Sequence, residues 1–201
     1  MAKASTSKTS PPKSDLVVQP ADVLDQAADA ALKLAGETPW ADLTLRDIAL
    51  GAGVSFAALY ARAPSKSALI DRLSKRLDQA ALKAAEDPSP DVGDRLFEAV
   101  MGRLEVMESD RIVLIAIARS EGPSPRVARR LAVTARALLE ASGVDAGGRR
   151  GALRLAAMTG VWVRVLQVWR DDEGALNRTM AEIDKRVKLM RKRLGRVGAG
   201  L

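Results

Sequence analysis

Hydrophobic residues recur at intervals of three and four along most of the chain, starting just after Pro20. The first such segment shows the spacing in three successive pairs: Val23/Leu24, Ala27/Ala28 and Ala31/Leu32. This is the period of an amphipathic α-helix, and Gly36 supplies a typical stop signal. Residues 1–18 have no such period and are rich in Lys, Ser, Thr and Pro, so we expect a flexible arm there. The pattern as a whole predicts an all-α protein.

Two short helices joined by a tight turn are predicted to begin at Thr44 and Ser55. Thr44 can cap the first helix, and Asp47, three residues later, can return the hydrogen bond as in a capping box. Gly53 permits the positive φ that a tight turn needs, and Leu59 would face inward from the second helix. This arrangement is the helix-turn-helix that places a recognition helix in the major groove of DNA.

The second half of the chain predicts further helices, separated by turns rich in Pro and Gly. The longest apolar stretch runs from Ala152 to Trp169 and contains Arg154 and Arg164. Two arginines near the centre of a bilayer would cost several kcal/mol, so the stretch is not expected to span a membrane. We expect a buried central helix or a dimer seam instead.

The last predicted helix has a narrow apolar seam at spacings of four and three, which is typical of a helix packed against a partner. The seam consists of Leu176, Met180, Ile183, Val187, Met190 and Leu194. The opposite face is strongly basic: Lys185, Arg186, Lys188, Arg191, Lys192, Arg193 and Arg196. One interpretation is a solvated face on a helix of the core or of a dimer interface. The other is attraction to an anionic surface, either a membrane or a nucleic acid.

Composition narrows the classes of function. The 201 residues include no Cys, which excludes disulfides and thiolate metal sites, and no His, the commonest metal ligand and general base. No nucleophile–base set, phosphate-binding loop or metal-ligand spacing is present, so we expect neither an enzyme nor a cofactor. The polar N-terminal segment lacks the apolar core of a signal peptide, and we expect a cytoplasmic protein.

The net charge of +7 is unevenly distributed. Residues 21–85, which contain the predicted helix-turn-helix, carry eight basic and eight acidic groups. Residues 183–201 carry seven basic groups against Asp184. A basic protein is often a nucleic-acid binder, but here the excess charge lies in the tails and not at the helix-turn-helix.

Residues 44–69 resemble the DNA-binding domain of the TetR family of regulators. The residues that match the family pattern are Thr44, Asp47, Ile48, Ala49, Ala52, Gly53, Val54, Ser55, Leu59, Tyr60, Pro64, Ser65, Lys66 and Leu69. The resemblance implies a homodimer with a three-helix DNA-binding domain followed by a helical domain for ligand binding and dimerisation. With the arm at 1–18, we place these domains at 19–79 and 80–195, followed by a flexible tail at 196–201.

The resemblance also implies two sets of DNA contacts. Phosphates would be contacted by Thr44, Tyr60 and Lys66. The residues nearest the bases would be Ser55, Phe56, Ala57 and Arg62, of which Phe56 stands where the family often has Lys or a small polar residue. The recognition helix therefore offers few groups that hydrogen bond to base edges.

Two functions fit this resemblance. The first is a regulator, most simply a repressor, that a small apolar effector releases from a palindromic operator. The alternative is a lipid- or quinone-binding accessory protein, because accessory proteins of ubiquinone biosynthesis share the fold and reach anionic membranes through a basic C-terminal helix. Segments 94–104 and 168–193 resemble bacterial proteins that lie between the two groups.

Flexible Met and large aromatic side chains suit an adaptable apolar cavity in the helical domain. The candidate lining residues are Met101, Leu104, Met107, Met158, Trp162 and Trp169. Ordinary core packing explains each of these residues equally well.

Overall fold

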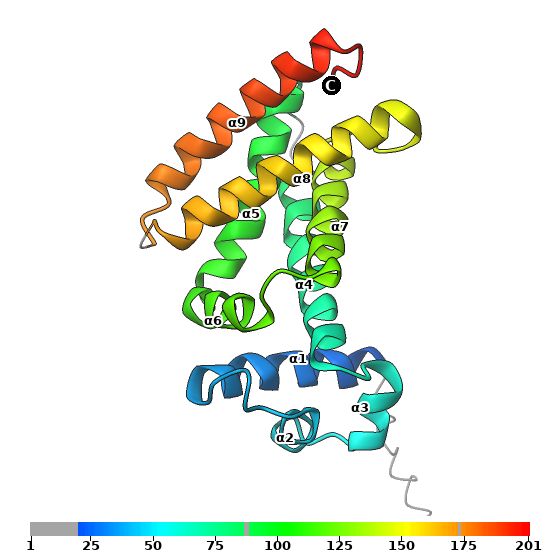
Figure 1. The fold of residues 1–201 in the computed structure, drawn as a ribbon, viewed down its shortest axis with the longest axis vertical. Helices are drawn as coiled ribbons and strands as arrows, with labels where there is room; N and C mark the ends of the chain where they lie inside the picture. Colours follow the sequence, from blue (N-terminus) through cyan, green and yellow to red (C-terminus); the bar gives the residue numbers. More distant parts are fainter. Residues whose placement is uncertain (1–19, 87–88, 173) are drawn as a thin grey trace, which may run out of the picture.

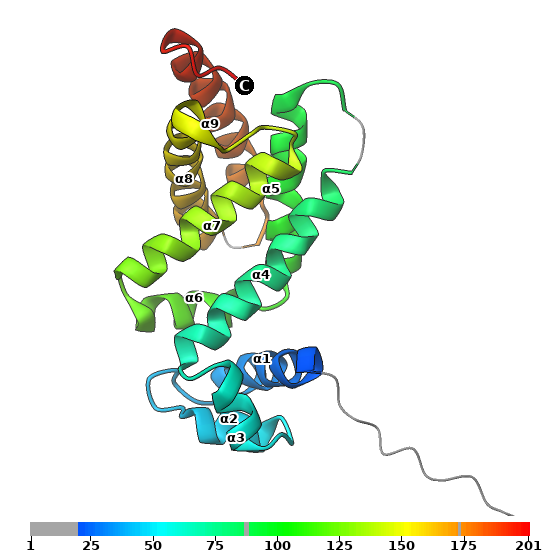
Figure 2. The same ribbon diagram turned by 90° about the vertical axis from the view of Figure 1, so that its right-hand side faces the viewer.

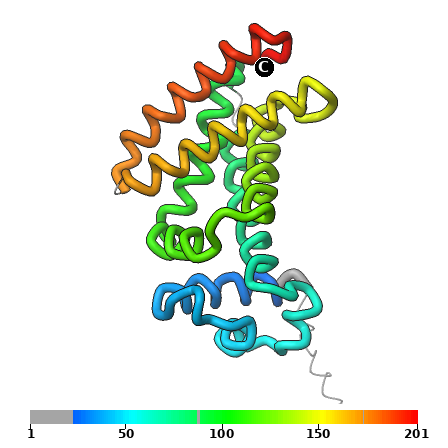
Figure 3. Tube along the Cα trace, in the orientation of Figure 1, coloured from blue at the N-terminus to red at the C-terminus, as the bar shows by residue number. Residues whose placement is uncertain are grey.

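The computed structural model describes residues 20–86, 89–172 and 174–201, which form nine α-helices and no strand. The predicted all-α fold is therefore confirmed, while the predicted arm at 1–18 lies outside the described residues. Figure 1 shows a small N-terminal group of helices below a larger bundle, and Figure 3 traces the same path as a single tube.

The N-terminal group consists of α1 (Pro20–Glu37), α2 (Leu45–Gly51), α3 (Phe56–Arg62) and the first half of α4 (Lys66–Ala84). Its core is built from the inner faces that the spacing predicted, and it includes Ala27, Ala31, Ile48 and Leu59. Trp40, in the turn after α1, is also buried in this core.

Helix α4 belongs to both parts of the molecule. Leu69 and Leu73, near its beginning, lie in the N-terminal core, whereas Ala81 lies in the core of the larger bundle. The domain boundary that we placed between residues 79 and 80 thus falls inside one continuous helix. Helix α4 therefore links the two parts of the molecule through one unbroken helix.

The larger bundle contains α5 (Val92–Glu108), α6 (Arg111–Glu121), α7 (Pro125–Ala141), α8 (Gly148–Arg170) and α9 (Asn177–Arg196). Figure 2 shows α6 lying across the lower end of the bundle, above α1. Ile117 of α6 is buried in the N-terminal core, so α6 is a second connection between the two parts.

The C-terminal helix packs against α5 and α8 through most of the predicted seam. Ile183, Val187, Met190 and Leu194 are buried. Met180 is 41% exposed, so the prediction that it belongs to the seam was wrong. Thr179 takes the inner position instead, because its backbone N and its Oγ1 both donate to the buried carboxylate of Asp172 at 2.7 Å. Because this contact at the start of α9 is made by polar residues, the spacing of hydrophobic residues in the sequence does not predict it.

Residues 197–201 fold back onto the bundle, in contrast to the flexible tail that we expected at 196–201. Arg154 donates to the carbonyls of Ala199 and Gly200 at 3.1 and 2.6 Å, and Ala199 is fully buried. The interaction depends on an arginine in α8, more than forty residues earlier in the chain. None of the described helices is long and apolar enough to cross a membrane.

Candidate nucleic-acid interface and ligand cavity

The first helix of the helix-turn-helix begins at a complete capping box. The backbone N of Asp47 donates to Oγ1 of Thr44 at 3.2 Å, and the backbone N of Thr44 donates to Oδ2 of Asp47 at 2.8 Å. The Thr44 hydroxyl and backbone bonds lower the pKa of the Asp47 carboxyl. The predicted cap is therefore confirmed, and it fixes where α2 begins.

The turn between α2 and α3 is closed as the sequence predicted. Gly53 has φ of +66°, the left-handed region that glycine adopts readily, and the N–H of Val54 donates to the carbonyl of Ala49. Ser55 precedes α3 in an extended conformation, but its side chain makes no cap hydrogen bond. The Ser55 hydroxyl thus has no role in helix capping.

Most side chains that we assigned to DNA contacts lie exposed around α3. Thr44, Ser55, Phe56, Ala57, Tyr60 and Arg62 are exposed, and Leu59 of α3 is fully buried on the inner side. The Phe56 and Tyr60 ring centroids are 5.7 Å apart, and the Arg46 guanidinium lies 6.0 Å from the Phe56 centroid. Arg46 was not among the residues that we predicted to contact DNA, although it is an exposed cation in α2.

Two predicted contact residues bind within the domain. The Lys66 ammonium donates to the carbonyl of Trp40 and lies 4.9 Å from the centroid of the Trp40 ring. Burial is the main cause that lowers the pKa of Lys66, against the opposing charge of Asp42. The Arg62 guanidinium donates to the carbonyl of Ala58 at 3.1 Å, so it folds back along α3.

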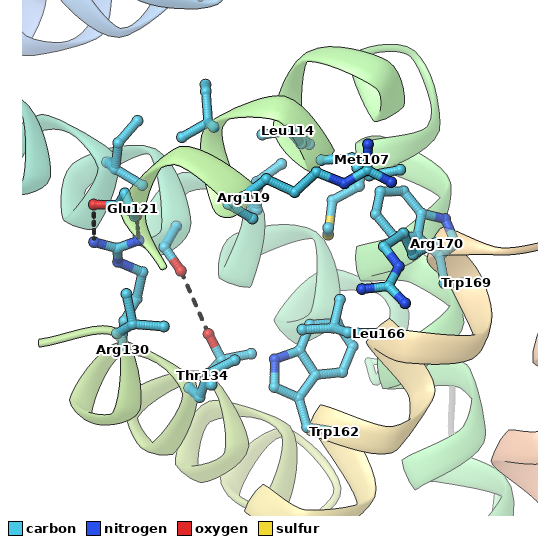
Figure 4. A pocket seen from close by; sticks show the side chains of 18 of the residues that line it. Met107, Leu114, Arg119, Glu121, Arg130, Thr134, Trp162, Leu166, Trp169 and Arg170 are labelled. Atoms are coloured by element: carbon cyan, nitrogen blue, oxygen red, sulfur yellow. Dashed lines mark hydrogen bonds and ion pairs between the residues drawn. The ribbon is translucent and has the colours of Figure 1, made fainter. Parts of the chain in front are cut away.

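A cavity of about 600 Å³ lies between α4, α5, α6, α7 and α8. Its walls are mostly apolar, and Figure 4 shows Trp162, Leu166 and Trp169 projecting from α8 along one side. Of the predicted lining residues, the structure brings Met107, Trp162 and Trp169 to this cavity. Met101, Leu104 and Met158 are buried in the core and do not line it.

A buried polar cluster forms one wall of the cavity. Nε of Arg103 lies 2.7 Å from Oδ1 of Asp78, and Oγ1 of Thr134 donates to the same oxygen at 3.0 Å. The guanidinium also donates to Oγ of Ser74 and lies 4.8 Å from the Trp162 centroid. Burial lowers the pKa of Arg103, and the charge of Asp78 opposes this effect.

The sequence contains one signal for this cluster. Val100, Arg103 and Met107 are spaced by three and four, so Arg103 falls on the apolar face of its helix. A charged residue at such a position requires a buried partner. The partner itself, Asp78 on another helix, could not be identified without the fold.

A second charged group closes the cavity on the side of the N-terminal domain. The Arg130 guanidinium forms ion pairs with Glu121 of α6 and with Asp71 of α4. Burial tends to lower the pKa of Arg130, but the hydrogen bonds that Arg130 donates to Glu121 and Asp71, together with the charges of these carboxylates, outweigh burial and raise it. This network joins α4, α6 and α7 where the two parts of the molecule meet.

Comparison with known proteins agrees with this geometry. The model of "Bacterial regulatory proteins, tetR family" matches residues 28–73, which include the capping box, the turn and α3. No curated protein matches the chain.

Solved structures share the fold over most of the chain. A TetR transcriptional regulator from Nitrosomonas europaea ATCC 19718 aligns with a TM-score of 0.66 at 23% identity, covering 83% of this chain and 96% of its own. A TetR transcriptional regulator from Rhodococcus sp. RHA1 gives a TM-score of 0.66 at 16% identity, covering 84% and 95%. A TetR-family regulator from Streptomyces coelicolor gives 0.57 at 22%, covering 87% and 98%.

Proposed function

This chain belongs to the TetR family of DNA-binding transcriptional regulators, and we propose that it is a repressor released from a palindromic operator by a small ligand. The observation that carries the proposal is the exposed surface of α3 beside α2, whose start is fixed by a capping box. Such a surface presents side chains to a DNA groove while the buried Leu59 holds the helix in place. As a regulator of bacterial transcription, the protein acts in the cytoplasm.

In the proposed complex, phosphate contacts fix the position of the domain and α3 reads the bases. Thr44 and Tyr60 bind phosphates, and Lys66 joins them with a third ammonium proton that its bonds to the carbonyls of Trp40 and Ala41 leave available. Ser55, Phe56, Ala57 and Arg62 face the base edges.

The recognition helix α3 offers few side chains that can hydrogen bond to base edges, and this limits how sequence specificity can arise. Phe56 is 42% exposed, so it can contact a thymine methyl group, and Arg62 can exchange its bond to the Ala58 carbonyl for a base. Specificity then relies on these few contacts, on the shape of the DNA and on two half-sites read by a dimer.

The proposed dimer forms through α8 and α9. The outward side of α8 carries Ala152, Leu153, Ala156 and Gly160 exposed, beside a groove that α9 completes with Leu189 and other residues. Small residues let two helices approach closely, and an exposed apolar strip of this kind is typical of an interface. A two-fold axis here would pair two copies of the same strip.

Ligand release requires the cavity to communicate with α3. Ile70, Leu73, Ser74 and Leu77 of α4 line the cavity, and α4 follows α3 after a short turn. A ligand that binds better to one position of α4 shifts the population towards that position. In a dimer, such a shift changes the distance between the two recognition helices and releases the operator.

A second candidate, membrane association as a lipid-binding accessory protein, is favoured by the basic outer face of α9. Lys185, Lys192, Arg193 and Arg196 are exposed there. The apolar face of α9 is already buried in the bundle, so contact with a membrane would be electrostatic and would not involve insertion. Vesicles rich in anionic lipid should then bind the native chain, and changing these four residues to Gln should abolish the binding.

Enrichment of genomic DNA fragments on the purified protein tests the proposed function. We expect one or a few palindromic sites to be recovered by the native chain and by Arg129→Gln, a change on the exposed face of α7. Tyr60→Ala should recover none. Recovery of unselected DNA alone, or the same sites with Tyr60→Ala, would contradict the proposal.

A further inference from the structure

We infer that the ligand of the cavity is an amphiphile with a single carboxylate: its apolar body fills the cavity and the carboxylate lies at Arg119. The inference rests on the proposed function, because it names the class of ligand that the regulator would sense. It follows from the composition of the walls and from the pairing of each charged residue in them.

The walls require a largely apolar ligand body. Leu73, Leu114, Leu166, Trp162 and Trp169 contribute apolar surface from three helices. A volume of about 600 Å³ lies within the range of roughly 300–1,000 Å³ that is usual for small-molecule sites. A strongly polar ligand would lose its hydration without gaining partners along most of this surface.

The deep polar groups of the cavity are satisfied within the protein. Arg103 is paired with Asp78, which also accepts from Thr134. Arg130 is paired with both Glu121 and Asp71. Neither arginine brings a net positive charge that a ligand must neutralise, so neither selects an anion.

Arg119 differs from these residues. It lines the cavity, it is exposed, and it forms no ion pair with any residue that the structure describes. Figure 4 shows its side chain extending across the cavity towards Trp169 and Arg170. Arg170, the other arginine at this side, is paired with its neighbour Asp171 at 2.9 Å.

The electrostatics at this side of the cavity are consistent with an anion site. The hydrogen bond from Arg170 lowers the pKa of Asp171 most, and the charges of Arg178 and Arg119 lower it further. Three guanidinium groups thus act on one carboxylate. A ligand carboxylate at Arg119 would balance the excess positive charge through charge-assisted hydrogen bonds.

A neutral ligand would be at a disadvantage in the same position. Its body would displace water from one side of the Arg119 guanidinium, and the hydroxyl of an alcohol would offer only an uncharged acceptor, which a guanidinium binds more weakly than a carboxylate. A carboxylate avoids this loss. We therefore expect the acid of a given chain length to bind about tenfold more tightly than the matching alcohol.

Fluorescence of Trp162 and Trp169 allows the comparison to be made directly on the full chain, without DNA. The probes are dodecanoate and dodecanol, titrated at about pH 8, where the acid is ionised. The variants are Arg119→Gln and, as a matched control, Arg129→Gln, which removes an exposed arginine of α7 that does not line the cavity.

The native chain and Arg129→Gln should bind dodecanoate about tenfold more tightly than dodecanol. Arg119→Gln should bind both probes with the Kd that the native chain has for dodecanol, which also shows that its cavity is intact. Equal affinities of the native chain for the two probes, or a preference retained by Arg119→Gln, would overturn the inference. Since neither result depends on DNA, the inference and the proposed operator binding can fail separately.

Discussion

The guanidinium of Arg103 in α5 lies 2.7 Å from the carboxylate of Asp78 in α4, and both side chains are more than nine-tenths buried. This ion pair joins the helix that carries the N-terminal domain to the centre of the larger bundle. Thr134 and Ser74 complete its hydrogen bonds, so the charges are compensated within the core.

Removal of one partner should destabilise the fold strongly. Asp78→Asn leaves the Arg103 charge buried without a counter-ion, and we expect a loss of about 3–5 kcal/mol in the free energy of unfolding. Urea unfolding at matched protein concentration measures it. The control Asp184→Asn removes an exposed pair with Lys188 and should cost roughly 0–1 kcal/mol.

A double variant shows whether the loss comes from the unpaired charge. Asp78→Leu combined with Arg103→Met replaces the pair by apolar groups and should recover most of the stability that Asp78→Asn loses. If the double variant is as unstable as Asp78→Asn, the unpaired charge is not the cause.

The capping box should affect stability and Ser55 should not. Thr44→Ala removes the acceptor for the Asp47 amide, and we expect a loss of about 1 kcal/mol. Ser55→Ala removes a hydroxyl that makes no cap bond, so its effect should stay within about 0.5 kcal/mol while DNA affinity falls. Thermal unfolding with both variants distinguishes the two roles, and equal losses would refute the distinction.

Gly160 tests the proposed dimer interface. A Cβ atom added there would meet no atom within 4 Å beyond the neighbouring residues and backbone of its own helix, so we expect Gly160→Leu to leave the monomer folded. In a dimer that packs α8 closely, the added side chain would separate the two helices. Sedimentation should show monomers for Gly160→Leu and dimers for the native chain and for Ala128→Leu on exposed α7. A dimeric Gly160→Leu would place the interface elsewhere.

Acid should weaken the anchor of α9. Burial tends to raise the pKa of Asp172, but the two bonds from Thr179 outweigh it, so the folded pKa lies below the ordinary value. The stabilisation is therefore present above the unfolded pKa of about 4 and is lost as the pH falls through the lower folded value. Urea midpoints should fall with acidification, and less steeply in Asp172→Asn. Identical pH profiles would contradict this origin.

Local features were predictable from the sequence, whereas contacts between distant helices were not. Thr44, Gly53 and Leu59 lie within one short segment, where helix caps and turns follow simple spacing rules. The pairing of Arg103 with Asp78 joins two separate helices, so it required the fold, and the bonds from Thr179 to Asp172 depend on how the turn between α8 and α9 closes. Two of the cavity's aromatic residues were found by composition, but Arg119 was not, because an exposed arginine has no distinguishing pattern.

Binding to a palindromic duplex tests the central claim most directly. The site recovered from genomic DNA is compared with a scrambled duplex of the same composition, by fluorescence anisotropy at fixed salt. We expect the native chain to prefer the palindrome by about a thousandfold or more, and Tyr60→Ala to lose that preference while remaining a folded dimer. Equal affinity of the native chain for both duplexes would contradict operator recognition by α3.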